Sequence, residues 1–288
     1  MTAFSRFQKY ALGGICAITG ATLYYYRFSE NGQKTKQIEF FNTKNTSEVM
    51  KFVPTTKWDS NWDKRDPKSM VKPMKIKSTN DENDYNEKLD AQKPHTVRHL
   101  LLIRHGQYNL AGQNDAERIL TDLGRRQAES TGKRLAELAL PYSLIIRSTM
   151  ARAQETSKII EKSLMKVPVI DDSILVEGSP IPPEPPIGHW KAESQYFQDG
   201  PRIEAAFRKY FHRASPRDVS DSYTIIVCHA NVIRYFVCRA LQFPPEAWLR
   251  LSLKHASITW VSIHPSGRVT LRCFGDSGHM LPEYLTTS

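Results

Sequence analysis

The stretch that decides the fold is Val97-Arg98-His99-Leu100-Leu101-Leu102-Ile103-Arg104-His105-Gly106-Gln107. An apolar run of this length that ends at a glycine is typical of a buried parallel strand, and open α/β sheets place their sites just beyond the carboxyl ends of such strands. A histidine beside an arginine at that position suits a general base, or a nucleophile toward phosphorus with the arginine binding phosphoryl oxygens. Arg104-His105-Gly106 is therefore the candidate centre of chemistry, although the triplet alone is a weak signal because most histidines are structural or exposed.

Beyond this stretch, predicted strands and helices alternate. Thr121 suits the N-cap of an amphipathic helix that runs to Leu135. The further predicted strands are 142–147, a region framed by 167–170 and 174–176, and 223–229; the further predicted helices begin near Arg152 and cover 204–212 and 230–241. This alternation predicts an α/β fold, a mostly parallel sheet flanked by helices on both faces.

The strand ends carry the remaining candidate residues. Because parallel strands end at one edge of a sheet, Arg104, His105, Arg152, Glu177 and His229 are expected in one crevice. An arginine at a helix N-terminus adds a fixed charge to free backbone N–H groups and makes an anion site, whereas the alternative for Arg152 is an ordinary exposed helical arginine. The proline-rich stretch 179–186 is interpreted as the rim of the site rather than as an SH3-type ligand.

The N-terminal part divides into a short tail, 1–9, and an uncharged segment, 10–26, with basic residues on both flanks. At about 1.5 Å per residue a helix of this segment is near the lower limit for crossing a bilayer, and tyrosines at both ends suit an interfacial belt. A cleaved signal peptide is the alternative, but the segment ends in Tyr24-Tyr25-Tyr26-Arg27 rather than in small residues. A single-pass transmembrane anchor is therefore predicted.

Residues 27–96 are rich in Lys, Asn, Asp, Thr and Ser, show little helical or strand periodicity and are interpreted as a polar linker before the catalytic domain, 97–288. The exception is Trp58-Asp59-Ser60-Asn61-Trp62-Asp63. Two tryptophans inside a polar segment are costly to leave exposed, so they are expected to dock either onto the chain's own domain or onto another copy or partner. The acidic stretch 80–84 is interpreted as a solvated patch.

The composition of the chain limits the classes of partner and of cysteine chemistry that it favours. The chain has 288 residues, 40% of them hydrophobic, and a formal net charge of +10. No basic block with interleaved aromatic residues and no zinc-finger spacing occurs, so nucleic acid is the least favoured anionic partner, after lipid and phosphorylated substrates. The four cysteines lie far apart in the sequence, which favours inert or reduced thiols over a disulfide framework.

Taken together, these motifs resemble the histidine phosphatase superfamily, also called the phosphoglycerate mutase family. The motifs that carry the resemblance are Arg104-His105-Gly106, Leu-Thr-x-x-Gly-x-x-Gln-Ala at 120–128, Ser-x-x-x-Arg-Ala at 148–153, Glu177, and His229 followed by Ile233-Arg234. The resemblance covers roughly residues 97–275 and implies the histidine phosphatase fold.

The resemblance also implies roles for these residues. His105 attacks phosphorus in line; Arg104, Arg152 and His229 neutralise the phosphoryl oxygens; Glu177 protonates the leaving oxygen and later deprotonates water. Gln107 is implied as a further substrate contact, and neither a cofactor nor a metal is needed. Glu177 requires a raised pKa for this work. The chain departs from the family at Ala111, where an Asn is frequent, at Ala230, where a Gly is frequent, and in lacking the Trp-Glu-Gly pattern after Glu177.

Within the family, the anchor, the Trp-Asp motif and the sequence Arg-His-x-Gln-Tyr resemble the mitochondrial serine/threonine-protein phosphatases. This implies hydrolysis of phosphoserine and phosphothreonine in proteins, a mitochondrial membrane location with the outer membrane favoured over the inner, and a homo-oligomer formed through residues 58–63 (Trp58, Asp59, Asn61, Trp62 and Asp63). A stress-activated MAP kinase kinase kinase of the apoptosis signal-regulating type is an implied partner, with roles in cell death and mitochondrial homeostasis, whereas the motif for a Kelch-type adaptor is absent near 80–87. The alternatives are a small-molecule phosphatase or mutase, and a membrane-tethered scaffold.

Overall fold

The computed structural model describes residues 56–75, 78–188 and 191–287. The predicted tail 1–9, the predicted anchor 10–26 and the first part of the predicted linker lie outside these ranges. None of the helices within them combines the length and apolar character that a membrane span requires. Cys228, Cys238 and Cys273, the cysteines within the same ranges, are free thiols.

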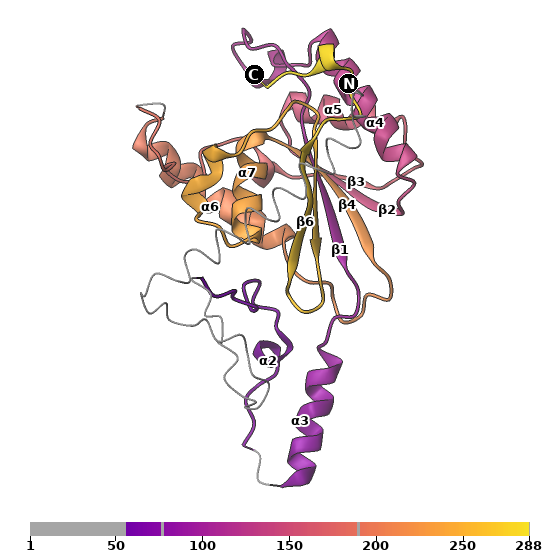
Figure 1. Cartoon of the computed structure of the whole chain (residues 1–288), viewed down its shortest axis with the longest axis vertical. Coiled ribbons are helices and arrows are strands. Elements are labelled where there is room, and N and C mark those ends of the chain that lie inside the picture. Colours follow the sequence, from indigo (N-terminus) through magenta and orange to yellow (C-terminus); the bar gives the residue numbers. More distant parts are fainter. Residues whose placement is uncertain (1–55, 76–77, 189–190, 288) are drawn as a thin grey trace, which may run out of the picture. The chain divides into compact units, whose positions relative to one another are not determined.

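A six-stranded sheet forms the centre of the domain predicted at 97–288 (Figure 1). The strands are β1 (Arg98–Arg104), β2 (Tyr142–Arg147), β3 (Val169–Asp171), β4 (Ser222–Cys228), β5 (Ile258–Ile263) and β6 (Val269–Asp276). Their order is β3-β2-β4-β1-β5-β6, with β3, β2, β4 and β1 parallel. β5 pairs with β1 and with β6 in the antiparallel sense, so the sheet is mixed, with antiparallel pairing at the edge formed by β5 and β6. A short turn joins β5 to β6, and a connection of that length permits only antiparallel pairing.

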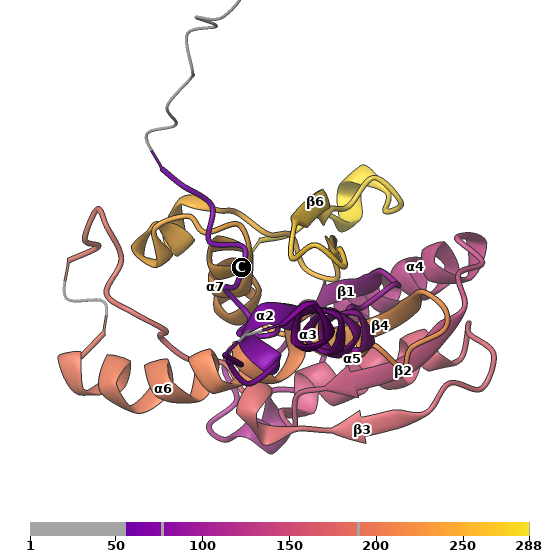
Figure 2. The same cartoon turned by 90° about the horizontal axis from the view of Figure 1, so that it is seen from below.

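Alternate residues of β1 face two separate hydrophobic clusters. Leu100 and Leu102 pack in a cluster with Phe207 and Phe236, which belong to α6 (Glu193–Tyr210) and α7 (Ala230–Ala240). Leu101 and Ile103 belong to the other cluster, whose helices are α4 (Asp122–Glu137) and α5 (Ala151–Glu161). The period of two along a strand explains this division, and it confirms that helices cover both faces of the sheet. Figure 2 shows the helices from a second direction.

Two predicted elements differ from the observed ones. The structure extends the helix predicted over 204–212 back to Glu193, through Pro201. In the third strand region only β3 is a strand, because the Asp172 side chain accepts a hydrogen bond from the Ile174 N–H and caps the 3-10 turn Ser173–Leu175. A side chain that satisfies the backbone locally competes with strand pairing.

The described part of the predicted polar linker contains two helices, α2 (Pro67–Met70) and α3 (Thr79–Ala91), where the sequence predicts little regular structure. Ser78 caps α3 by accepting a hydrogen bond from the Asp81 N–H, and Lys88 pairs with Asp84 one turn away at 2.6 Å. α3 buries none of its residues. It therefore lacks the apolar stripe by which hydrophobic periodicity identifies a helix.

Residues 58–66, here called the N-terminal clamp, pack on the domain formed by the sheet and its helices. Trp62 is 7% exposed, its ring lies 5.8 Å from that of Phe207, and its Nε1–H donates to the Gly267 carbonyl at 2.7 Å. Gly267 has φ of 83°, and a Cβ atom there would lie 2.6 Å from the Ser60 carbonyl oxygen. The clamp therefore fits closely against the turn between β5 and β6, which only glycine permits at this position.

An ion pair fixes the other side of the clamp. The side chains of Asp63 and Arg213 are 0% and 1% exposed, with Arg213 Nη2 2.9 Å from Asp63 Oδ1. Burial alone would raise the pKa of Asp63, but hydrogen bonds from Arg213 and Arg65 outweigh burial and lower it. Of the two docking sites considered for the Trp-Asp motif, the chain's own domain thus receives Trp62 and Asp63, whereas Trp58 is 38% exposed.

Candidate active site

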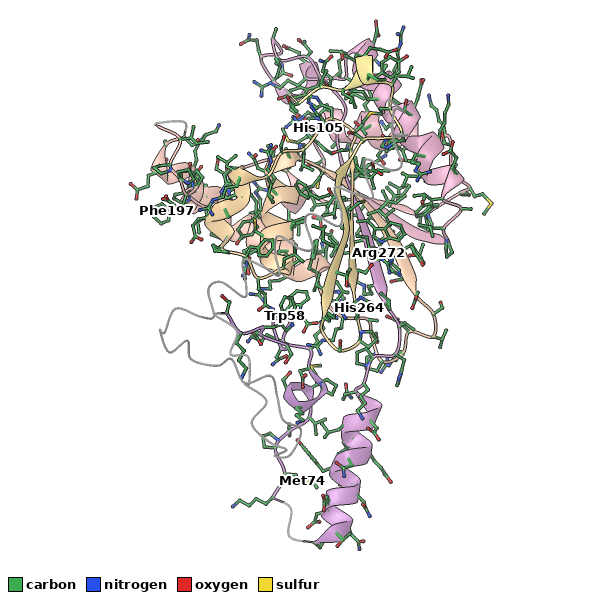
Figure 3. The ribbon with its side chains drawn as sticks, in the orientation of Figure 1. Trp58, Met74, His105, Phe197, His264 and Arg272 are labelled. Atoms are coloured by element: carbon green, nitrogen blue, oxygen red, sulfur yellow. The ribbon has the colours of Figure 1, made fainter. Side chains whose placement is uncertain are left out.

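The site lies at the carboxyl ends of the two central parallel strands. Arg104 ends β1 and His105 follows it, while His229 follows β4 and is the N-cap residue of α7. The His105 N–H donates to the Cys228 carbonyl at 3.0 Å, which extends the pairing of β1 with β4 by one residue. Figure 3 shows His105 beyond this end of β1. Arg152, in the first turn of α5, and Glu177, in the loop after β3, complete the predicted group.

His105 is held as a neutral imidazole. It is buried, and its Nδ1 lies 2.8 Å from the Gly106 carbonyl, which can only accept a hydrogen bond. Nδ1 therefore carries the proton, and Nε2, which accepts from Arg152 Nε at 3.3 Å, carries the lone pair. Burial, then His229 and the two arginines, hold the pKa of His105 well below its usual range. An unprotonated Nε2 is the form that attacks phosphorus.

In Arg104 and Arg152, some of the guanidinium nitrogens contact protein atoms and others do not. Arg104 Nη1 donates to the carbonyls of Leu253 and Thr287, both at 2.7 Å, and burial lowers the pKa of Arg104 to about 10. Arg152 lies 4.7 Å above the centre of the Tyr108 ring, and its Nη1 is 3.6 Å from an Asp115 oxygen. The charges of both arginines act on His105 and lower its pKa.

Three buried nitrogen atoms of the site make no hydrogen bond with the residues that the structure describes: Arg104 Nε, Arg152 Nη1 and His229 Nδ1. Buried polar atoms are nearly always partnered, so three such atoms, on side chains that all act electrostatically on His105, indicate a place for an acceptor-rich ligand. Hydrogen-bond donors near the reactive His105 nitrogen suit a phosphoryl group, because such a group presents several acceptor oxygens.

His229 is fully buried, and its ring centre lies 5.1 Å from that of His105. Its Nε2 is 2.8 Å from the Ser148 hydroxyl, which leaves Nδ1 on the unpartnered side. Burial, followed by the charges of Arg152 and Arg104, holds the pKa of His229 well below its usual range. A dianionic ligand would oppose that effect and favour a proton on Nδ1.

Glu177 is partly exposed, but protein surrounds its carboxyl group. This burial raises the pKa of Glu177, while the Gly178 N–H, which donates at 3.1 Å, and the two arginines act in the opposite direction. The raised pKa agrees with the direction that acid catalysis requires.

Gln107 sits beside the site on the side of α4. Its side-chain carbonyl accepts from the Thr121 hydroxyl at 2.8 Å, and its backbone N–H donates to Gln127 Oε1 at 2.8 Å. A Cβ atom on Gly124 would lie 1.9 Å from the Gln107 carbonyl oxygen. The start of α4 therefore supports the loop that carries His105, and a glycine is needed for that approach.

Several residues contact the site without having been assigned a role from the sequence. Tyr108 packs edge-on against the His105 ring, with 5.1 Å between the ring centres, and the Thr156 hydroxyl accepts from the Gly106 N–H at 3.0 Å. His255 contacts Arg104, from which it is separated by 151 residues. Tyr108 and Ser148 lie within the motifs at 104–108 and 148–153, which could have indicated them, whereas no local pattern indicates Thr156 or His255.

The described residues include no group of three or more His, Cys, Asp or Glu side chains that could hold a metal ion. The side chains of this site can provide nucleophilic attack by an imidazole, anion binding by two arginines and a second imidazole, and proton transfer by a carboxyl group.

Comparison with known proteins agrees with this geometry. The description "Histidine phosphatase superfamily (branch 1)" matches residues 100–179 and 189–276, and the chain belongs to this family. This confirms the resemblance that the motifs indicate.

Curated relatives are more specific. The chain is 56% identical over 232 residues to the protein named "Serine/threonine-protein phosphatase Pgam5, mitochondrial" of Drosophila ananassae, an alignment that covers 80% of each chain. The protein of the same name from Drosophila erecta is 49% identical over 93% of this chain and 92% of its own. Among solved structures, the product of the open reading frame Rv3214 of Mycobacterium tuberculosis is 25% identical, with a TM-score of 0.50 over 63% of this chain and 99% of that one.

Proposed function

We propose that this protein is a mitochondrial protein phosphatase that hydrolyses phosphoserine and phosphothreonine through a phosphohistidine at His105. The observation that carries the proposal is the neutral His105, whose Nε2 lone pair lies among buried nitrogens without hydrogen-bond partners in the described part of the chain. The names of the curated relatives support the substrate class and the location.

The first step forms the phosphoenzyme. His105 Nε2 attacks phosphorus in line as the bond from phosphorus to the serine or threonine oxygen breaks. Glu177, whose raised pKa favours the protonated carboxyl group, gives its proton to that leaving oxygen. Arg104, Arg152 and His229 stabilise the negative charge on the phosphoryl oxygens, while the hydrogen bond from Nδ1–H to the Gly106 carbonyl steadies the positive imidazole.

The second step is hydrolysis. Water attacks phosphorus, Glu177 takes a proton from this water, and the bond from phosphorus to His105 Nε2 breaks. Inorganic phosphate leaves, and both His105 and Glu177 return to their starting protonation states. The same carboxyl group thus serves as acid and then as base, as microscopic reversibility requires.

Three further properties belong to the same proposal: a single-pass anchor at 10–26 in a mitochondrial membrane, with the outer membrane favoured, homo-oligomerisation through 58–63, and a stress-activated MAP kinase kinase kinase as a partner. For oligomerisation the supporting observation is Trp58, an exposed aromatic residue beside a docked motif. Measuring the mass of the assembly in solution for the wild type and for Trp58→Ala tests oligomerisation. An unchanged mass refutes a role for Trp58.

The catalytic proposal is tested by phosphate release from phosphothreonine and phosphoserine peptides in the presence of a chelator, with His105→Ala as the inactive control. With a substrate that carries a radioactive phosphoryl group, stopping the reaction in alkali, where phosphohistidine persists, should leave the label bound to the wild-type enzyme. His105→Ala should carry no label. Turnover of phosphoglycerates without turnover of peptides would instead identify a small-molecule phosphatase or mutase. Inactivity on both would favour the scaffold.

A further inference from the structure

His255 lies in contact with Arg104, on a loop before β5, and is 1% exposed. Its Nε2 is 3.0 Å from Arg104 Nη2, and its Nδ1 is 2.8 Å from the Thr286 hydroxyl oxygen. The His255 backbone N–H donates to the Thr286 carbonyl at 2.9 Å. The ring is thus fixed on both nitrogens, with a phosphate-binding candidate on one side and the segment that follows η4 (Pro282–Tyr284) on the other.

These contacts determine the protonation state of the ring. An arginine nitrogen can only donate, so His255 Nε2 must accept and must carry the lone pair. Nδ1 then holds the proton and donates it to the Thr286 hydroxyl oxygen. Burial and the charge of Arg104 lower the pKa of His255 to about 3, so the neutral ring persists throughout the physiological range.

The same segment is tied to the other side of the site. Gln127 Nε2 donates to the Tyr284 carbonyl at 2.6 Å and to the Thr286 hydroxyl at 2.8 Å, while Gln127 Oε1 accepts from the Gln107 N–H at 2.8 Å. Thr286 therefore accepts hydrogen bonds from both His255 and Gln127. Its position links the orientation of Arg104 to that of the loop carrying His105.

Arg104 reaches the site with its Nε unpartnered in the described structure, while both of its terminal nitrogens are held by the protein. We propose that His255 is a positioning residue for phosphoryl transfer, which as a neutral acceptor supported by Thr286 fixes the Arg104 guanidinium so that its Nε faces the phosphoryl group. This inference rests on the proposed phosphatase function and adds to it two residues, His255 and Thr286, that do not touch the substrate.

The test compares His255→Leu, which removes the acceptor, with His255→Gln, whose side-chain oxygen can replace Nε2. The readouts are the affinity of the full chain for inorganic phosphate, by calorimetry, and the hydrolysis of p-nitrophenyl phosphate, by absorbance. The matched control is His264→Leu: His264 is a partly buried histidine that contacts Thr270 and lies far along the sheet from His105 (Figure 3).

We expect His255→Leu to weaken phosphate binding and to lower kcat/KM by about tenfold each, since a hydrogen bond to a charged group contributes on that scale. His255→Gln should recover most of both, and His264→Leu should change neither. A lower melting temperature for His255→Leu with unchanged phosphate affinity would show a merely structural role and overturn the inference.

Thr286→Val provides a second variant if His255→Leu does not fold, because it removes the hydroxyl that holds the ring and preserves the shape. It should weaken phosphate binding several-fold, and an unchanged affinity would equally overturn the inference. Failure of the proposed function is separate: wild-type protein would then hydrolyse p-nitrophenyl phosphate no faster than His105→Ala.

Discussion

The buried pair of Asp63 and Arg213 gives a strong prediction for Asp63→Ala. In the folded protein the Asp63 carboxylate accepts from the Arg213 backbone N–H at 2.8 Å and from Arg213 Nε and Nη2 at 2.9 to 3.2 Å. The substitution would leave Arg213 buried without that carboxylate; the nearest other one, Asp66, is 3.7 Å away and partly exposed.

Removing one partner of a buried ion pair costs about 3 to 5 kcal/mol of unfolding free energy. For a folded unit of this size, Thr56–Ser288, each kcal/mol shifts the melting temperature by about 2 to 4 °C, so Asp63→Ala should melt about 6 to 20 °C lower. The lowered pKa of Asp63 also determines how the stability of the protein depends on pH. The contribution of Asp63 to the free energy of unfolding is complete above the ordinary carboxyl pKa and is lost as the pH falls through the lowered pKa.

Calorimetry of the wild type and Asp63→Ala at equal protein concentration measures this cost. The control is the double variant Asp63→Leu with Arg213→Met, which removes both charges and should recover much of the loss. Peptide hydrolysis measured well below the melting temperature reports the site separately. A loss under about 1 kcal/mol would refute the assignment of the clamp as part of the folded domain, because that value belongs to an exposed pair.

Three further predictions concern the site. His105→Ala should lower peptide hydrolysis by at least about a thousandfold with little change in melting temperature, and residual turnover near the wild-type rate would exclude the phosphohistidine route. The rate of peptide hydrolysis should fall as the pH rises through the raised pKa of Glu177, since the carboxyl group must be protonated to act as the acid. The rate of Glu177→Gln should not show this fall. If the variant retains the fall, the fall belongs to another group. Gly124→Ala should destabilise the protein by about 1 to 3 kcal/mol and slow hydrolysis, because its Cβ would meet the Gln107 carbonyl, and denaturant unfolding showing no loss would contradict this contact.

The sequence predicts the parts of the site that follow strands. His105 and His229 come directly after apolar runs, and the parallel order of β1 and β4 brings their ring centres to 5.1 Å. Arg152 has a local signal as well, because it opens a helix after a strand. These residues could be found because their positions depend on periodicity and on strand direction, which are local properties.

The remaining parts depend on distant contacts. His255 and Thr286 reach Arg104 and Gln127 across more than a hundred residues, and no spacing in the sequence predicts such a pairing. The antiparallel strands β5 and β6 follow the last predicted helix and escaped prediction. α3 escaped it because capping and ion pairs, rather than an apolar face, support the helix.

The docking of Trp62 constrains the order in which the chain acquires its structure. Its hydrogen-bond partner Gly267 lies 205 residues further along the chain. At ribosomal rates of about 5 to 20 residues per second, the tryptophan therefore emerges roughly 10 to 40 s before the turn that covers it. Closure of the clamp is thus among the last steps of biosynthesis, and until then a bare indole remains available to chaperones.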